Sequence, residues 1–82
     1  MRYSAKVSRS LADLIQGETA VLDRIDLPEE FAHKLMTMGF IPGTAIEAAQ
    51  AAPGGDPRVF RVDGSEVALR RETAQHLYVR AA

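Results

Sequence analysis

The sequence predicts an all-β domain, a small and partly open β-barrel with one α-helix and one or two short helical turns. Three observations lead to this fold class. About five short segments alternate apolar and polar residues, as strands with one buried face do. One longer segment, around residues 28–38, repeats its apolar residues at helical spacing. The chain has 82 residues, so it forms one domain with a small core, and a barrel covered by the helix is the most economical arrangement.

The first element is expected only after a polar segment without periodicity. Residues 1–9 are therefore predicted to be a loose arm that precedes the domain of residues 10–80. Ser10 stands before a short apolar run, with Asp13 three positions later, which is the pattern of a capped helical turn. Gly17 is expected to end this turn.

The helix has clear start and stop residues. Pro28 is predicted at the first helical position, because its fixed φ suits a helix start and its missing N–H costs nothing there. Phe31, Leu35 and Met38 follow at i, i+4 and i+7, which predicts one apolar stripe. Gly39 is expected to end the helix in a left-handed conformation.

The strands are predicted over residues 19–25, 44–52, 60–62, 66–70 and 77–79. Apolar residues recur in phase along the first four, as Val21 and Ile25, Ile46 and Ala48, Phe60 and Val62, and Val67 and Leu69. Asp63-Gly64 predicts a two-residue hairpin turn, and Pro42-Gly43 predicts a tight turn after the helix. Residues 71–75 are long enough for a single helical turn.

Composition excludes several classes of function. The chain has no cysteine and a net charge of −1, so disulfides, thiolate metal sites and cysteine nucleophiles are excluded. The charge is too balanced for the basic field that nucleic-acid binding needs, so no nucleic-acid partner is expected. No apolar run approaches 18 residues, and no apolar segment of a secretion signal follows the N-terminus, which indicates the cytoplasm. The serines lack a patterned histidine and carboxylate, so an enzyme is not expected.

An ordered set of motifs carries a resemblance to a known family. The set runs from residue 11 to residue 79: Leu11…Leu14…Gly17; Ala20-Val21…Ile25; Leu35-x-x-Met38-Gly39-Phe40-x-Pro42-Gly43; Gly55-Asp56-Pro57; and Val62-x-Gly64-x-x-Val67-Ala68-Leu69-Arg70, followed by Ala74 and Val79. In this set the chain resembles ferrous iron transport protein A, FeoA, and the related SH3-like domain at the C-terminus of some metal-dependent repressors. It departs from the family at Met38, where leucine is usual, a swap that conserves volume.

The resemblance implies an SH3-like barrel with a cytoplasmic accessory or adaptor role in bacterial ferrous iron uptake. The implied partner is FeoB, a membrane transporter with a GTP-binding domain, so the membrane would be reached only through the transporter. The alternative is a metal-binding regulatory module in which a divalent metal bridges molecules. The sequence leaves a homo-oligomer open.

Two groups of residues are candidates for a functional site. Met38, Phe40, Ile41 and Pro42 form the turn after the helix and are predicted to contact a partner. The alternative is that this turn is architectural, with Phe40 in the core. Glu29 and His33, and likewise Glu72 and His76, are spaced at i and i+4, which places a carboxylate and an imidazole on one helix face, as zinc or ferrous iron would require.

The alternative for both Glu–His pairs is that their side chains are solvated surface residues without a metal.

A third feature is the arginine-rich stretch around Arg58, Arg61, Arg70 and Arg71. It is either a small basic patch for an acidic partner or phosphate, or a solvated sheet face.

Overall fold

The computed structural model describes residues 9–82 and contains a six-stranded antiparallel sheet in the order β1-β6-β2-β3-β4-β5. The elements in chain order are β1 (Arg9–Ser10), η1 (Leu11–Asp13), β2 (Thr19–Ile25), α1 (Glu29–Thr37), β3 (Ala45–Ala51), η2 (Pro53–Gly55), β4 (Arg58–Val62), β5 (Ser65–Leu69), α2 (Arg71–Ala74) and β6 (Leu77–Ala81). This mostly β architecture, with one longer helix and short helical turns, confirms the predicted fold class.

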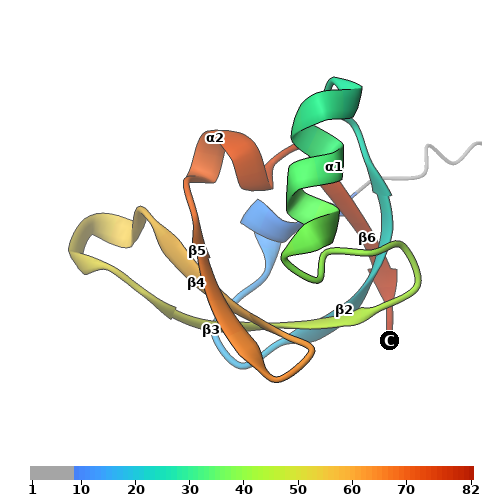
Figure 1. Ribbon diagram of the computed structural model, residues 1–82. Helices are drawn as coiled ribbons and strands as arrows, with labels where there is room; N and C mark the ends of the chain where they lie inside the picture. The colour runs from blue at the N-terminus through green and yellow to red at the C-terminus, as the bar shows by residue number, and fades with distance from the viewer. Residues whose placement is uncertain (1–8) are drawn as a thin grey trace, which may run out of the picture.

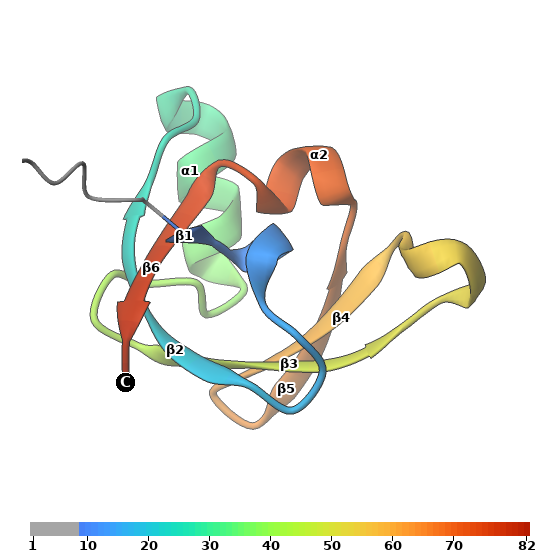
Figure 2. The same cartoon turned by 180° about the vertical axis from the view of Figure 1, so that it is seen from behind.

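The sheet is strongly curved, so that its strands enclose a small interior. In Figure 1 α1 lies between the β5–α2 segment on one side and β2 with β6 on the other. Seen from behind in Figure 2, the short η1 turn lies toward the interior. The β3–β4 hairpin continues past the barrel and ends in the projecting η2 loop. None of the helices in residues 9–82 is long and apolar enough to cross a membrane.

The core draws on nearly every element. Phe40 and Phe60 are its largest fully buried side chains. Leu11 and Leu14, from η1 and the residue after it, are also fully buried, and they close the interior from the side of the N-terminal turn. The remaining buried apolar residues are Ala20, Leu22, Leu35, Ile46, Ala48, Val62, Leu69, Ala74, Leu77 and Val79.

The local start and stop residues were predicted well. Ser10 caps η1 through a capping box with Asp13. The helix ends before Gly39, which has a φ of +108°. Asp63 and Gly64 both have positive φ, as a two-residue hairpin turn of the mirror type requires.

Other predictions were wrong in detail. In β2 the buried residues are Ala20 and Leu22; Ile25 is half-buried and packs against the core, whereas Val21 is half-buried and not in phase with it. An irregularity in the pairing of β2 with β6 between Leu22 and Arg24 changes the alternation along the strand.

The helix and the N-terminal segment also differ from expectation. Pro28 is the N-cap, so α1 begins one residue later than predicted. Gly17 has a φ of +91° but lies beyond η1, which already ends at Asp13. Arg9, placed in the loose arm by the sequence, pairs with Val79 in the sheet. The rest of the predicted arm, residues 1–8, lies outside the described residues.

Candidate functional site

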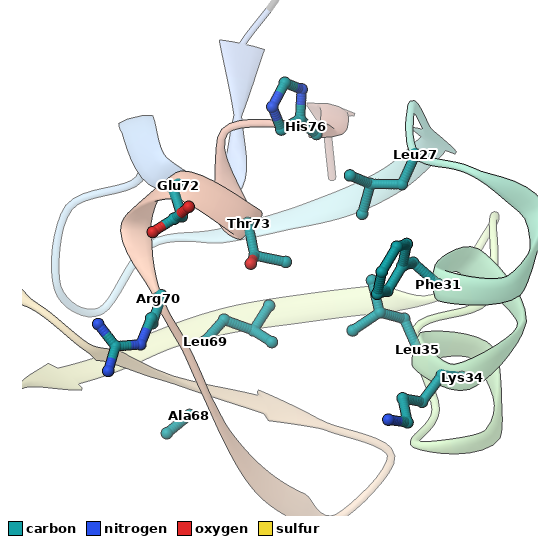
Figure 3. A pocket seen from close by; sticks show the side chains of 10 residues that line it. All are labelled: Leu27, Phe31, Lys34, Leu35, Ala68, Leu69, Arg70, Glu72, Thr73 and His76. Carbon is teal, nitrogen blue, oxygen red and sulfur yellow. The ribbon is translucent and has the colours of Figure 1, made fainter.

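A groove lies between α1 and the segment that joins β5 to α2. Its volume is about 480 Å³. Leu27, Phe31 and Leu35 line it from the helix side, and Leu69 lines it from β5. Figure 3 shows these apolar side chains facing one another across the groove. Leu35 and Leu69 are buried, whereas Phe31 is 54% exposed.

Phe31 is exposed because the apolar stripe predicted on the helix is only partly buried. Phe31, Leu35 and Met38 share one face of α1, but only Leu35 is buried. The core already contains Phe40 and Phe60, and α1 contributes one buried side chain to it, Leu35 in its last turn. Phe31 and Met38 therefore lie at the rim, and the helix presents apolar surface to its surroundings.

Charged side chains surround the groove. Lys34 lies on the α1 side, and Arg70 lies at the opposite end, just after β5. Neither cation forms an ion pair within residues 9–82. Glu72 and the half-buried His76 complete the polar rim. The groove thus combines an apolar floor with two unpaired positive charges.

The turn after α1 separates core from surface. Phe40 is fully buried, and its N–H donates to the carbonyl oxygen of Leu35 at 3.1 Å. Predicting Phe40 as a partner contact was therefore wrong, because its ring is in the core of the folded chain. Met38 and Ile41 are 38% and 50% exposed, and Pro42 is exposed. We call Met38, Ile41 and Pro42 the helix-end patch.

The structure keeps the two predicted metal-binding pairs apart. Glu29 and His33 are exposed on α1 and border a shallow depression with Glu30. Glu72 lies in α2, but His76 follows the end of that helix, and the two side chains point in different directions. In the part of the chain that the structure describes, no three His, Cys, Asp or Glu side chains gather into a group that could hold a metal. A metal held by these pairs would need ligands from a second molecule.

Two of the four arginines in the arginine-rich stretch, Arg58 and Arg61, are held by other partners. Arg61 forms ion pairs with Glu47 at 3.1 Å and with Glu66 at 2.8 Å. Arg58 extends toward the N-terminal turn and donates from Nη1 to the carbonyl oxygen of Leu14, 44 positions earlier in the chain. The interpretation as one basic patch over these strands is therefore wrong, and Arg70 remains as the cation beside the groove.

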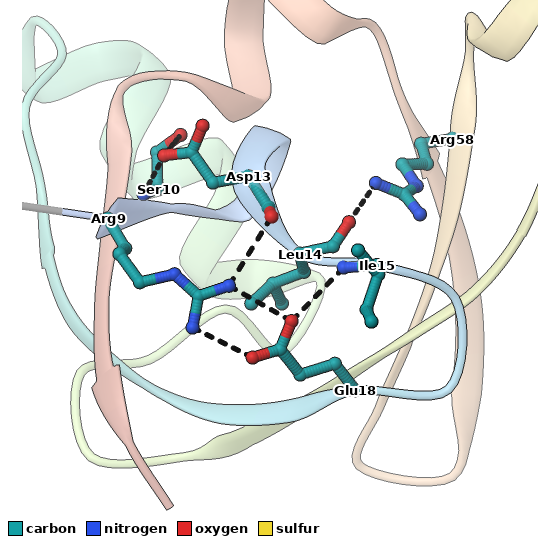
Figure 4. A network of polar contacts seen from close by, with 7 residues as sticks. All are labelled: Arg9, Ser10, Asp13, Leu14, Ile15, Glu18 and Arg58. Atoms are coloured by element: carbon teal, nitrogen blue, oxygen red, sulfur yellow. Dashed lines mark hydrogen bonds and ion pairs between the residues drawn. The ribbon is translucent and has the colours of Figure 1, made fainter.

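A polar network holds the N-terminal turn against the sheet (Figure 4). Arg9 donates to both carboxylate oxygens of Glu18, at 2.7 and 3.0 Å, and Ile15 N–H donates to the same group. These hydrogen bonds, that from Arg9 first, lower the pKa of Glu18 to about 2. Sequence reasoning missed this pair, since its nine-residue separation matches neither helical nor strand periodicity.

Comparison with known proteins gives a consistent result. The family model described as the FeoA domain matches residues 9–81. The chain is 36% identical over 69 residues to the Fe(2+) transport protein A/Fe(2+) transporter FeoB fusion protein of Porphyromonas gingivalis, a match that covers 84% of this chain and 8% of that protein.

Solved structures are similar as well. The solution structure of iron(II) transport protein A from Clostridium thermocellum has a TM-score of 0.83 and 36% identity, covering 89% of this chain and 45% of that one. The crystal structure of Stenotrophomonas maltophilia FeoA complexed with zinc, described as a prokaryotic SH3 domain protein, has a TM-score of 0.74 and 28% identity, covering 87% and 88% of the two chains.

Proposed function

The chain belongs to the FeoA family, and from this premise we propose that it is an accessory protein of ferrous iron uptake that binds the cytoplasmic region of a FeoB-type transporter. The role is one of protein–protein contact and not of catalysis. We place the protein in the cytoplasm, where it would meet the membrane only through the transporter.

The observation that carries the proposal is the fusion in Porphyromonas gingivalis, where a domain similar to this chain shares one polypeptide with FeoB. Fusion through a linker gives two domains an effective concentration in the millimolar range. The fusion therefore supports association of the same two domains when they are separate chains. A separate chain needs an exposed surface of its own for that association.

Exposed apolar side chains around α1 support such a surface. Phe31 lies in the first turn of α1, and Met38 and Ile41 of the helix-end patch follow its last turn; all three side chains are more than a third exposed. Aromatic residues and methionine are enriched in the buried centres of protein interfaces. We propose that the helix-end patch contacts the transporter.

A retention experiment tests this function. The chain is immobilised, and the soluble cytoplasmic region of the FeoB-type transporter from the same organism is passed over it. Retention by the wild type is expected, with weaker retention by Ile41→Asp. Ile15→Asp is the matched control, since Ile15 is 70% exposed but lies in the loop between η1 and β2.

Two outcomes are decisive. If the wild type fails to retain the transporter region at tens of micromolar and fails to restore ferrous iron uptake in a deletion strain, the proposed function is wrong. If Ile41→Asp and Ile15→Asp retain it equally, the helix-end patch is not the contact.

A further inference from the structure

Among the residues that the structure describes, 9–82, no strand pairs with the outer edge of β5. β5 is the last strand of the sheet order, and its partner is β4. Val62 and Ser65 flank the hairpin turn, and in a two-residue hairpin this first pair exchanges hydrogen bonds. Because hydrogen-bonded and non-hydrogen-bonded residue pairs alternate along antiparallel strands, the backbone N–H and C=O groups of Glu66 and Ala68 point away from β4. Within residues 9–82, neither residue has another backbone hydrogen bond at this edge.

The groove described above runs beside this free edge. Ala68 and Leu69 both line it, although their side chains alternate to opposite faces of the sheet. Leu69 is buried and supplies the floor with Leu35, whereas the exposed Ala68 reaches the groove from the strand edge. Unpaired backbone groups and an apolar floor thus lie next to each other.

The charges around the groove favour an acidic occupant. Lys34 and Arg70 lie on opposite sides of it without an ion pair among the described residues. Of the described residues that line the groove, Glu72 alone is acidic. Carboxylates on a partner would complement the two cations, whereas a basic partner would be repelled.

We propose that the β5 edge and this groove bind an extended acidic segment of the transporter by strand addition. The segment pairs with the backbone of Glu66 and Ala68, places one large apolar side chain over Leu35 and Leu69, and directs carboxylates toward Lys34 and Arg70. Strand addition takes its affinity from main-chain hydrogen bonds and its specificity from side-chain pockets. This proposal rests on the proposed function for the identity of the partner.

The size of the groove agrees with a segment and not a folded domain. Its volume of about 480 Å³ lies within the roughly 300–1,000 Å³ of ordinary ligand sites. It therefore accepts one or two side chains, while the edge of β5, five residues long, accepts a short stretch of backbone.

The test uses 12-residue synthetic peptides that tile the cytoplasmic segments of the FeoB-type transporter, titrated into the full chain by fluorescence anisotropy. Binding is expected from peptides that carry an aliphatic or aromatic residue between carboxylates, and it should weaken with added salt. If no peptide binds, or if only basic peptides bind, the inference is overturned.

Variants of the groove locate the binding. Lys34→Glu and Arg70→Glu should each weaken binding about fivefold, since an exposed ion pair contributes up to about 1 kcal/mol. Arg24→Glu is the matched control, because Arg24 is an exposed cation stacked on Tyr78 in the β2–β6 region and away from the groove.

Ala68→Pro tests the strand edge itself. It removes an N–H that faces solvent and not β4, and proline is tolerated at such edge positions. Binding should fall by up to about tenfold for the lost hydrogen bond, with the unfolding temperature nearly unchanged. Phe31→Ser is a second variant that leaves the backbone intact and should also weaken binding.

The outcomes separate this inference from the proposed function. If the transporter region is retained by the wild type and equally by Lys34→Glu, Arg70→Glu, Ala68→Pro and Phe31→Ser, the function stands and the groove proposal is wrong. If the transporter region is not retained and ferrous iron uptake is not restored in the deletion strain, the function is wrong, and the peptide titration still decides whether the groove binds acidic segments.

Discussion

Substitutions at Phe40 and at its neighbour Ile41 should affect the stability of the fold very differently, because Phe40 is a core residue and Ile41 is a proposed contact residue. Phe40 is fully buried, whereas Ile41 is half exposed. Truncation of a buried phenylalanine to alanine costs about 3–5 kcal/mol, through lost apolar transfer and the cavity left behind. Truncation of an exposed residue usually changes stability by less than about 0.5 kcal/mol.

These magnitudes are large relative to the whole fold. A chain of 82 residues is expected to have a free energy of unfolding of about 4–12 kcal/mol. Phe40→Ala thus removes a large share of it. Even the lower cost, about 3 kcal/mol, should lower the unfolding temperature by about 12–24 °C. Ile41→Ala should leave the unfolding temperature within a few degrees of the wild type.

Urea unfolding followed by circular dichroism measures both variants, with unchanged m values showing that the unfolding transition is comparable. Phe40→Leu keeps much of the apolar volume and should cost less than Phe40→Ala, which provides a folded variant for the retention experiment. The reasoning is refuted if Phe40→Ala costs under about 1 kcal/mol, or if Phe40→Leu retains stability but loses the transporter.

Four further predictions concern stability, measured by unfolding, and in the last case association, measured by sedimentation. Glu18→Gln should remove the stabilisation that comes from the lowered pKa of Glu18, which is present above the ordinary glutamate pKa near 4.5 and is lost as the pH falls toward 2. The difference in unfolding temperature between the variant and the wild type should therefore shrink from pH 4.5 to pH 2. An unchanged difference would mean that the pair of Glu18 with Arg9 is not formed in solution. Gly39→Ala should lower the free energy of unfolding by about 1–2 kcal/mol, because residue 39 has a positive φ that alanine rarely adopts. Steric clash adds nothing to this cost, since an added Cβ meets only ordinary contacts. An unchanged free energy of unfolding in urea would contradict this prediction. Asp56→Ala should cost about 1 kcal/mol, with Asp56→Asn much milder, because the carboxylate accepts from the first N–H of α2 at 2.9 Å; equal costs would exclude the cap. Any zinc that the Glu–His pairs bind should be shared between molecules, so sedimentation should show a zinc-dependent dimer that His33→Ala abolishes; a zinc-loaded monomer would refute it.

Features with local causes could be predicted from the sequence. Gly39 ends the helix and Asp63-Gly64 forms the hairpin because each depends on backbone conformations that few residues adopt. Ile46 and Ala48, and likewise Phe60 and Val62, are two positions apart on their strands, and this spacing correctly identified two buried strand faces.

Features that depend on packing between distant segments could not be predicted. The irregularity after Leu22 brings Ile25 against the same core as Ala20 and Leu22, so Val21 and Ile25 are not in phase, and no local pattern indicates where a strand loses its register with β6. Phe40 was ambiguous for a related reason, since a turn residue is exposed or buried according to the sheet beneath it.

The candidate groove was the least predictable feature. Lys34 is an ordinary helix-surface residue in the sequence, and Arg70 is one of several neighbouring arginines. Only the folded chain shows that Arg61 pairs with two carboxylates, whereas Lys34 and Arg70 pair with none in the described part of the chain.

The bond between Asp56 and α2 has a practical consequence for anyone who labels this protein. The η2 loop projects from the barrel, which makes it the natural place for an epitope tag or a fluorophore. An insertion after Gly55 would displace the carboxylate that holds the start of α2, and α2 supplies Glu72 and Thr73 to the groove wall. A tag placed there would report on a protein whose groove had been altered by the tag itself.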